Sequence, residues 1–185
     1  MYQRLVQLNA LALGVLTLLG CSGSGAASTG FMVGKNLARK DSHLKILLDG
    51  QAGKQSTLKK AATGHSRFEI KEPASTHPKL QFEIERPDQF GRITMVSLQI
   101  HQKFEADYSH QAEFTVLAKD TNNPQAQMKP GVEYDLGSPG PEFKVVNLRN
   151  EEVKGVELVP GMKYMLVLTV KADKSETAQI YFQAQ

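Results

Sequence analysis

The chain has 185 residues, of which 41% are hydrophobic and 22% are charged, and its formal net charge is +3. These values are ordinary for a globular protein with room for one domain, and they argue against a chain that is disordered throughout. The single cysteine, Cys21, excludes a disulfide within the chain, so we expect the core alone to hold the domain.

The first segment is a short hydrophobic leader. Residues 1–20 contain one charge, Arg4, followed by an apolar run over residues 10–19 and the small residue Gly20. A helix that spans a bilayer needs about 20 mainly apolar residues, whereas the hydrophobic core of an export signal has about 7–15. The length of the apolar run therefore favours an export signal over a membrane-spanning helix.

The leader ends in Leu18, Leu19, Gly20 and Cys21, which resembles the lipobox of bacterial lipoprotein precursors. The resemblance implies cleavage between Gly20 and Cys21, a diacylglyceryl group on the sulfur of Cys21 and acylation of the new amine. It places the mature protein on the outer side of the cytoplasmic membrane. Because Ser22 follows the cysteine, it implies the outer membrane if the host is Gram-negative. An ordinary signal cleavage that leaves a free thiol is the alternative.

Lipid on Cys21 would tether the protein to a membrane without any membrane-spanning segment. Each buried methylene contributes about 0.8 kcal/mol, and two or more acyl chains hold a protein stably. Residues 22–30 are all Ser, Gly, Ala or Thr. We therefore expect residues 21–42 to form a flexible, lipidated tether.

Basic residues concentrate in one segment of the chain. Between residues 35 and 60 there are seven Lys or Arg and two Asp, whereas residues 61–185 have 14 basic and 17 acidic side chains. The basic segment either lies against anionic lipid headgroups or forms a solvated polar face. It has little aromatic interleaving and the protein is expected to be exported, so no nucleic acid partner is predicted.

Residues 43–78 are predicted to form a basic, irregular segment with one or two strands. Residues 43–48 have the composition of a strand, residues 67–71 alternate with a period of two, and residues 56–62 have helical composition. Pro73 and Pro78 then interrupt the pattern.

From residue 79 to residue 185, apolar and polar side chains alternate in about eight segments. The predicted strands cover residues 79–85, 92–103, 111–118, 132–136, 143–148, 153–158, 164–170 and 177–184. Alternation with one polar face is typical of antiparallel sheets, and this spacing of short strands indicates an all-β fold, an antiparallel β-sandwich over residues 79–185. The pattern places His101 on the polar face of its strand, towards solvent.

One local pattern makes the fold prediction more specific. Leu158, Pro160, Gly161 and Tyr164 form the pattern L-x-P-G-x-x-Y directly before a strongly alternating strand. This resembles the tyrosine corner of fibronectin type III and immunoglobulin-like domains, which implies a hydrogen bond between the Tyr164 hydroxyl and upstream backbone. The chain departs from those families in having no tryptophan and no cysteine pair, and another β-sandwich or a barrel is the alternative.

No motif in the sequence predicts catalysis, a metal site or a cofactor. The five histidines (residues 43, 65, 77, 101 and 110) form no H-x-H or H-E-x-x-H pair, and the adjacent Ser and His residues lack a G-x-S-x-G elbow. Glu83 and Glu85 share a solvated strand face, unlike a catalytic pair enclosed in a cleft.

The sequence therefore predicts a lipid-anchored envelope protein whose β-sandwich is a noncatalytic binding module for another envelope protein or a polysaccharide. The candidate binding elements are an open sheet edge, the loop over residues 104–110, which contains Tyr108, and the loop over residues 121–130. The alternative is a small-ligand carrier or assembly factor with a cavity between the sheets, which the aromatic content of 7% disfavours. An enzyme is the least favoured class.

Overall fold

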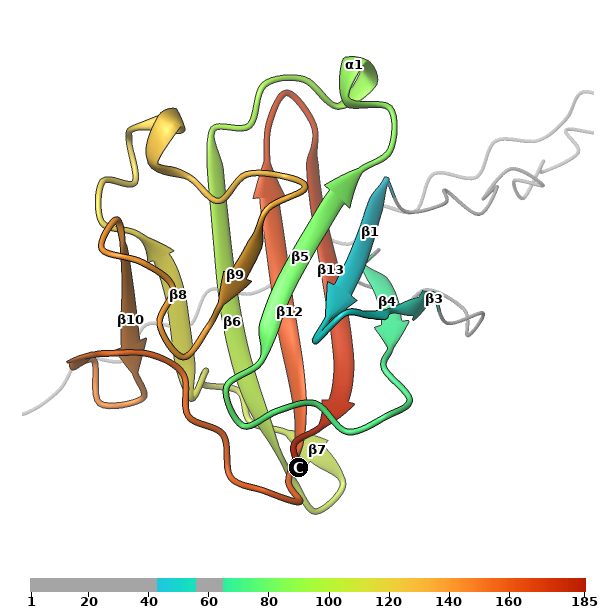
Figure 1. Ribbon diagram of the computed structural model, residues 1–185, viewed down its shortest axis with the longest axis vertical. Helices are drawn as coiled ribbons and strands as arrows, with labels where there is room; N and C mark the ends of the chain where they lie inside the picture. Colours follow the sequence, from blue (N-terminus) through green and yellow to red (C-terminus); the bar gives the residue numbers. More distant parts are fainter. Residues whose placement is uncertain (1–42, 56–64) are drawn as a thin grey trace, which may run out of the picture. The chain divides into compact units, whose positions relative to one another are not determined.

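The computed structural model describes residues 43–55 and 65–185, which form an all-β sandwich (Figure 1). The predicted leader over residues 1–20, the tether over residues 21–42 and the short helix over residues 56–62 lie outside the described residues. In the part of the chain that is described, no helix has the length and apolar character needed to cross a bilayer.

The smaller sheet lies in front in Figure 1 and is antiparallel throughout. Its strand order is β2 (Gln51–Ala52), β1 (Leu44–Leu48), β5 (Lys79–Ile84) and β9 (Glu133–Asp135). Alternate residues of β1 and β5 are buried, so the apolar side chains of each strand point towards the second sheet. We call this sheet A.

The larger sheet, sheet B, lies behind sheet A and contains the long central strands. Its order is β11 (Glu152–Val153), β10 (Phe143–Asn147), β8 (Phe114–Ala118), β6 (Met95–Phe104), β12 (Lys163–Lys171), β13 (Ser175–Gln183), β4 (Ser66–Glu69) and β3 (Lys54–Gln55). A short strand, β7 (Asp107–Tyr108), pairs with the end of β6. Strand β4 pairs with β13 in parallel, and the other pairs in this sheet are antiparallel. The helical turns α1 (Pro87–Phe90) and η1 (Pro124–Ala126) lie in connections.

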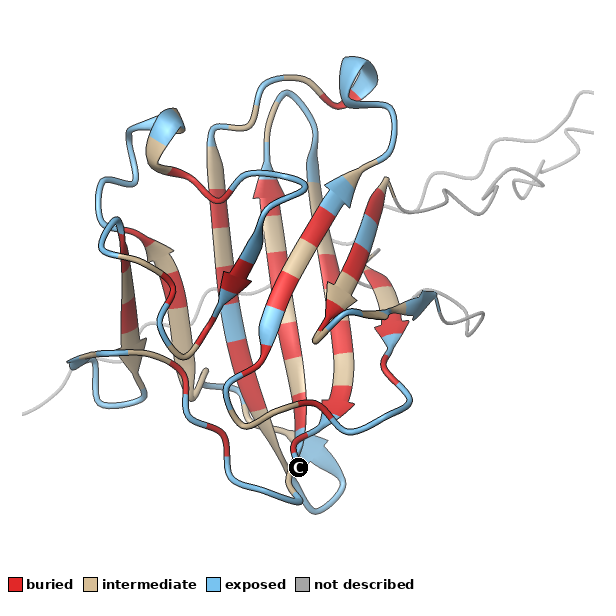
Figure 2. Cartoon of the chain, in the orientation of Figure 1, coloured by how far each residue is buried: buried red, intermediate tan, exposed pale blue. Residues whose placement is uncertain are grey.

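The core fills the space between the two sheets. Figure 2 shows buried residues alternating with more exposed ones along the central strands. In β12 every second residue from Tyr164 to Val170 is buried, and β13 has the matching pattern. This alternation is what the sequence predicted for both strands, because a sheet with one covered face needs apolar residues at a spacing of two.

The sandwich extends further towards the N-terminus than residue 79, where the sequence placed its start. Strand β1 pairs with β5 in sheet A, and β4 pairs with β13 in sheet B. The backbone N–H of Ala74 also donates to the carbonyl of Gln183 at 2.8 Å. The strands within residues 43–78 are therefore part of the sandwich and contribute to both sheets.

The strand predicted over residues 153–158 is absent beyond its first residue. Strand β11 ends at Val153, and Val156 and Leu158 each donate one backbone hydrogen bond, to Leu136 and Thr76 respectively. Val156 and Leu158 are both buried. The alternation in the sequence reflects this burial, although the segment forms no ladder.

The tyrosine corner predicted at Tyr164 has the hydrogen bond that the pattern implies. The backbone N–H of Val159 donates to the Tyr164 hydroxyl at 3.0 Å. Gly161 has a φ of 79°, and the backbone N–H of Met162 donates to the carbonyl of Val159 at 3.3 Å. Proline followed by a glycine at positive φ is typical of a type II turn, and this turn fixes the entry of the chain into β12.

A second corner of the same form lies in sheet A. The pattern x-P-G-x-x-Y recurs from Lys129 to Tyr134, and the backbone N–H of Lys129 donates to the Tyr134 hydroxyl at 2.8 Å. Gly131 has a φ of 80°, which matches the value at Gly161. This repeat was not predicted from the sequence, although both copies have a tyrosine three residues after a Pro-Gly pair.

Candidate binding site

The predicted binding loop over residues 104–110 folds back onto sheet B. Tyr108 pairs with Lys103 in the ladder between β6 and β7, and the N–H of Ser109 donates to the carbonyl of Gln102 at 2.8 Å. The ring nitrogen Nδ1 of His101 lies 2.9 Å from the carbonyl oxygen of Ser109, to which it donates as the Nδ1–H tautomer. The loop is thus held in place by backbone and side-chain bonds.

His101 corrects one prediction from the sequence. It was expected to face solvent, but only 9% of the residue is exposed. Its side chain does point away from the core, as alternation in β6 requires, and the returning loop covers it. The burial of His101 comes from a fold-back that the strand pattern does not encode.

The second predicted loop, over residues 121–130, is fastened by a buried amide. Gln127 is 3% exposed, and its Oε1 accepts a hydrogen bond from the backbone N–H of Val96 at 3.0 Å. Its Nε2 donates to the carbonyl of Asn123 at 3.1 Å. Because buried polar atoms need partners, these bonds commit Gln127 to holding the loop against β6, and a ligand would have to contact other side chains of the loop.

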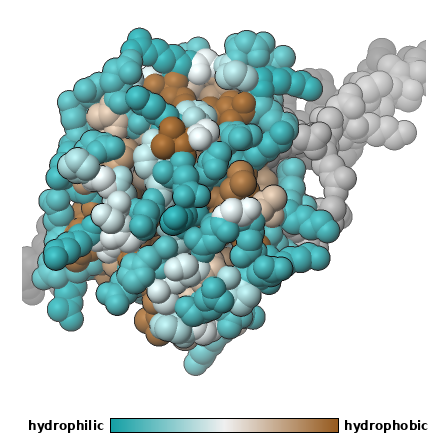
Figure 3. Space-filling view, viewed as in Figure 1, coloured by the Kyte–Doolittle hydropathy of each residue, from teal (hydrophilic) through white to brown (hydrophobic). Residues whose placement is uncertain are grey.

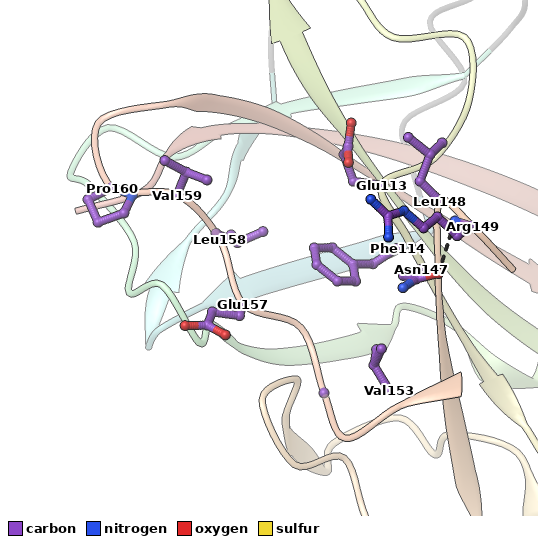
Figure 4. Close-up of a pocket in the computed structure, with 11 residues that line it drawn as sticks. Glu113, Phe114, Asn147, Leu148, Arg149, Val153, Glu157, Leu158, Val159 and Pro160 are labelled. Atoms are coloured by element: carbon purple, nitrogen blue, oxygen red, sulfur yellow. Dashed lines mark hydrogen bonds between the residues drawn. The ribbon is translucent and has the colours of Figure 1, made fainter. Parts of the chain in front are cut away.

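An open groove lies at the edge of sheet B, with a volume of about 600 Å³. The hairpin between β10 and β11 and the segment over residues 155–160 form its walls, and Phe114 at the start of β8 projects between them (Figure 4). We call it the edge groove, and it is lined by Glu113, Phe114, Asn147, Leu148, Arg149, Val153, Gly155, Glu157, Leu158, Val159 and Pro160.

The walls of the edge groove carry exposed apolar side chains. Leu148 is 49% exposed and Val159 is 56% exposed, although both are large hydrophobic residues. They come from segments on opposite sides of the Phe114 ring in Figure 4. By contrast, the face of the molecule seen in Figure 3, which carries sheet A, is mainly hydrophilic, with its apolar residues in small groups.

The hairpin wall of the groove is fixed by Asn147. Its Oδ1 accepts hydrogen bonds from the backbone N–H groups of Arg149 and Glu151, at 2.9 and 3.0 Å. Its Nδ2 donates to the Glu151 carboxylate at 3.0 Å. These bonds order the turn that presents Leu148, so its exposure comes from an ordered hairpin.

The other wall is fixed by a close approach of two backbones. A Cβ atom added at Gly155 would lie 1.8 Å from the carbonyl oxygen of Gly137, so only glycine fits at position 155. The sequence reading assigned residues 153–158 to a strand and therefore missed the groove. Leu148 and Val159 line the same groove because this segment crosses opposite the hairpin.

The side chains that could bind a metal do not gather in one place in the described part of the chain. Within residues 43–55 and 65–185, no three His, Cys, Asp or Glu side chains come together in a way that could hold a metal ion. Glu85 forms an ion pair with Lys45 at 3.1 Å, and the ring of His43 contacts that of Phe90. Cys21 lies outside the described residues.

The fold and the groove define the protein as an all-β sandwich with a preformed apolar surface at one sheet edge. Comparisons of the chain with family models, curated proteins and solved structures gave no match.

Proposed function

We propose that the protein is a lipid-anchored, noncatalytic binding module of a bacterial cell envelope, and that its edge groove receives an extended apolar segment of a partner protein. The observation that supports this proposal is the gathering of Leu148 and Val159 around one groove. Single exposed apolar residues are normal on protein surfaces, whereas several that surround a hollow are typical of interaction sites.

The shape and chemistry of the groove favour a short segment as its occupant. A volume of about 600 Å³ has room for a few side chains, and the terminal strand β11 lies beside it. Extended peptides commonly bind by adding to a sheet edge and placing alternate side chains in pockets. The groove is lined by two carboxylates, Glu113 and Glu157, and by one cation, Arg149. This excess of negative charge favours a segment that has a basic residue next to its apolar side chains.

The remaining parts of the proposal come from the sequence. Acyl chains on Cys21 would hold the sandwich at the membrane surface, within reach of other envelope proteins. Kinship with fibronectin type III or immunoglobulin-like domains is supported by the two-sheet architecture and by the bond from Val159 to Tyr164. The small-ligand carrier is less well supported, because the edge groove is open to solvent and a carrier would enclose its ligand.

The experiment is affinity purification of the full chain from solubilised envelopes of its host. We compare the wild type with Leu148→Lys and Val159→Lys, and use Val132→Lys as the matched control, since Val132 is also exposed but lies outside the groove. We expect one protein to co-purify with the wild type and with the control. The amount of that protein recovered should be lower by about tenfold or more with both groove variants. Equal recovery with all four chains, or recovery of a lipid in place of a protein, would contradict the proposal.

A further inference from the structure

The outward faces of the two sheets differ in charge, and sheet B has the excess of cations. On sheet A, Lys45 and Lys79 each pair with a carboxylate, of Glu85 at 3.1 Å and Glu133 at 3.5 Å. On sheet B, the outward side chains of β4, β6, β8, β10, β12 and β13 include one carboxylate, Glu69, and a larger set of cations: Arg67, Lys103, Lys144, Lys163 and Lys171. A second carboxylate, Glu152 of β11, pairs with Lys119 at 4.0 Å. A basic face of this kind attracts anionic ligands.

Three lysines on this side of the molecule surround one hollow of about 400 Å³. Lys71, Lys103 and Lys163 come from three separate segments and line it together with Glu69. Within the described residues, none of the three lysines has a carboxylate within ion-pair distance. The hollow therefore carries an excess of positive charge that the protein itself does not neutralise.

Two tyrosine rings also line this hollow. The rings of Tyr108 and Tyr181 meet edge to face, with their centroids 5.4 Å apart. The Tyr181 hydroxyl donates to Oε1 of Gln179 at 2.9 Å, and the guanidinium of Arg67 lies 5.9 Å from the centroid of the Tyr181 ring. Burial raises the pKa of the Tyr108 phenol, and Tyr181 adds to the shift, so Tyr108 remains a neutral hydrogen-bonding group.

The combination of rings and lysines indicates a particular ligand chemistry. The face of an aromatic ring is electron-rich and attracts the C–H groups of a sugar, while amides and hydroxyls bind the sugar's hydroxyls. Ammonium groups bind carboxylates through charge-assisted hydrogen bonds. A neutral sugar would leave the lysines without partners, and a simple anion would leave the rings unused.

We propose that this hollow binds a uronic acid unit of an anionic envelope polysaccharide, with Tyr108 and Tyr181 contacting the sugar ring and Lys103 and Lys163 binding its carboxylate. The polymer would continue along the basic outward face of sheet B. An anionic lipid surface is less favoured as the occupant, because it would use the lysines and leave the two rings that line the hollow without a role. This site is separate from the edge groove.

The test measures binding of oligogalacturonate to the full chain in detergent by titration calorimetry, with a neutral glucan oligosaccharide of the same length as the comparison. The double variant Lys103→Gln with Lys163→Gln removes two charges from the hollow. The matched control, Lys45→Gln with Lys79→Gln, removes the same charge from sheet A. Thermal unfolding of each variant verifies that it is folded.

We expect the oligogalacturonate to bind and the neutral glucan not to bind. The variant of the hollow should bind about tenfold more weakly or worse, and the control within about twofold of the wild type. Equal losses in both double variants would show attraction by net charge alone and overturn the proposal. Binding to phosphatidylglycerol vesicles without binding to the oligogalacturonate would also overturn it. Leu148→Lys should leave sugar binding unchanged, so failure here and failure at the edge groove are distinguishable.

Discussion

The two Pro-Gly-x-x-Tyr corners allow the contribution of a buried hydroxyl to be measured twice in one molecule. Tyr164→Phe and Tyr134→Phe each remove one hydroxyl and leave the ring in place. The rings keep their neighbours, because Tyr164 stacks on Phe182 and Tyr134 meets Phe143 edge to face. Any loss of stability therefore reports the hydrogen bond more than the packing.

The expected loss of stability follows from the hydrogen bond that each hydroxyl accepts, at 3.0 Å for Tyr164 and 2.8 Å for Tyr134. A hydrogen bond contributes about 0.5–1.5 kcal/mol net, and an unpaired buried donor costs about 1–3 kcal/mol. Both hydrogen bonds are only partly buried, so the cost of each freed N–H group lies at the low end of that range. We expect each variant to lose about 1 kcal/mol, roughly a fivefold change in the folding equilibrium.

The assay is urea unfolding of the wild type, the two single variants and the double variant. Because the corners lie in different sheets, we expect the double variant to lose about 2 kcal/mol, the sum of the single losses. Tyr181→Phe is the control, since its hydroxyl bonds a side chain on the outward face of sheet B. If Tyr164→Phe and Tyr134→Phe lose no more than this control, the corners do not stabilise the fold in the way we describe.

Three further predictions test other parts of the structure. Gly155→Ala should lower the free energy of unfolding by about 1–3 kcal/mol or more, because its Cβ would overlap the backbone of Gly137; an unchanged melting temperature would contradict that close approach. Gln127→Ala should cost about 1–3 kcal/mol by leaving the N–H of Val96 unpaired, and should speed proteolysis within residues 121–130; equal cleavage rates would count against the role of the amide. Cys21→Ser should move the protein from the membrane fraction to the soluble fraction, and unchanged fractionation would rule out the lipid anchor.

The sequence predicted the strands in which buried side chains alternate with exposed ones and the backbone also pairs in a ladder. β5, β12 and β13 alternate strictly because each has one face in the core, so their existence and their inward residues could be read directly. The hydrogen bond between the Val159 N–H and the Tyr164 hydroxyl was predictable for a similar reason, since Pro, Gly and Tyr at that spacing close a local turn. Both features depend on residues close together in the chain.

The features that the sequence did not predict depend on distant contacts. Val156 and Leu158 are buried in a segment that hydrogen-bonds to the backbone of Leu136 and Thr76, and no local pattern reveals these distant partners. His101 is buried by a returning loop, and β4 joins the sandwich through a parallel pairing with β13. The edge groove likewise joins side chains from three separate segments, so its apolar character is visible only after folding.

The most direct test of the proposed function is site-specific photo-crosslinking in intact envelopes. A photoreactive amino acid replaces Leu148 in the edge groove or, as the matched position on the opposite sheet, Gln81 on the outward face of sheet A. We predict that light produces one strong protein adduct from position 148, none from position 81, and none from position 148 when Val159→Lys is added. Adducts of equal strength from both positions, or no adduct from position 148, would contradict the claim that the groove binds a partner protein.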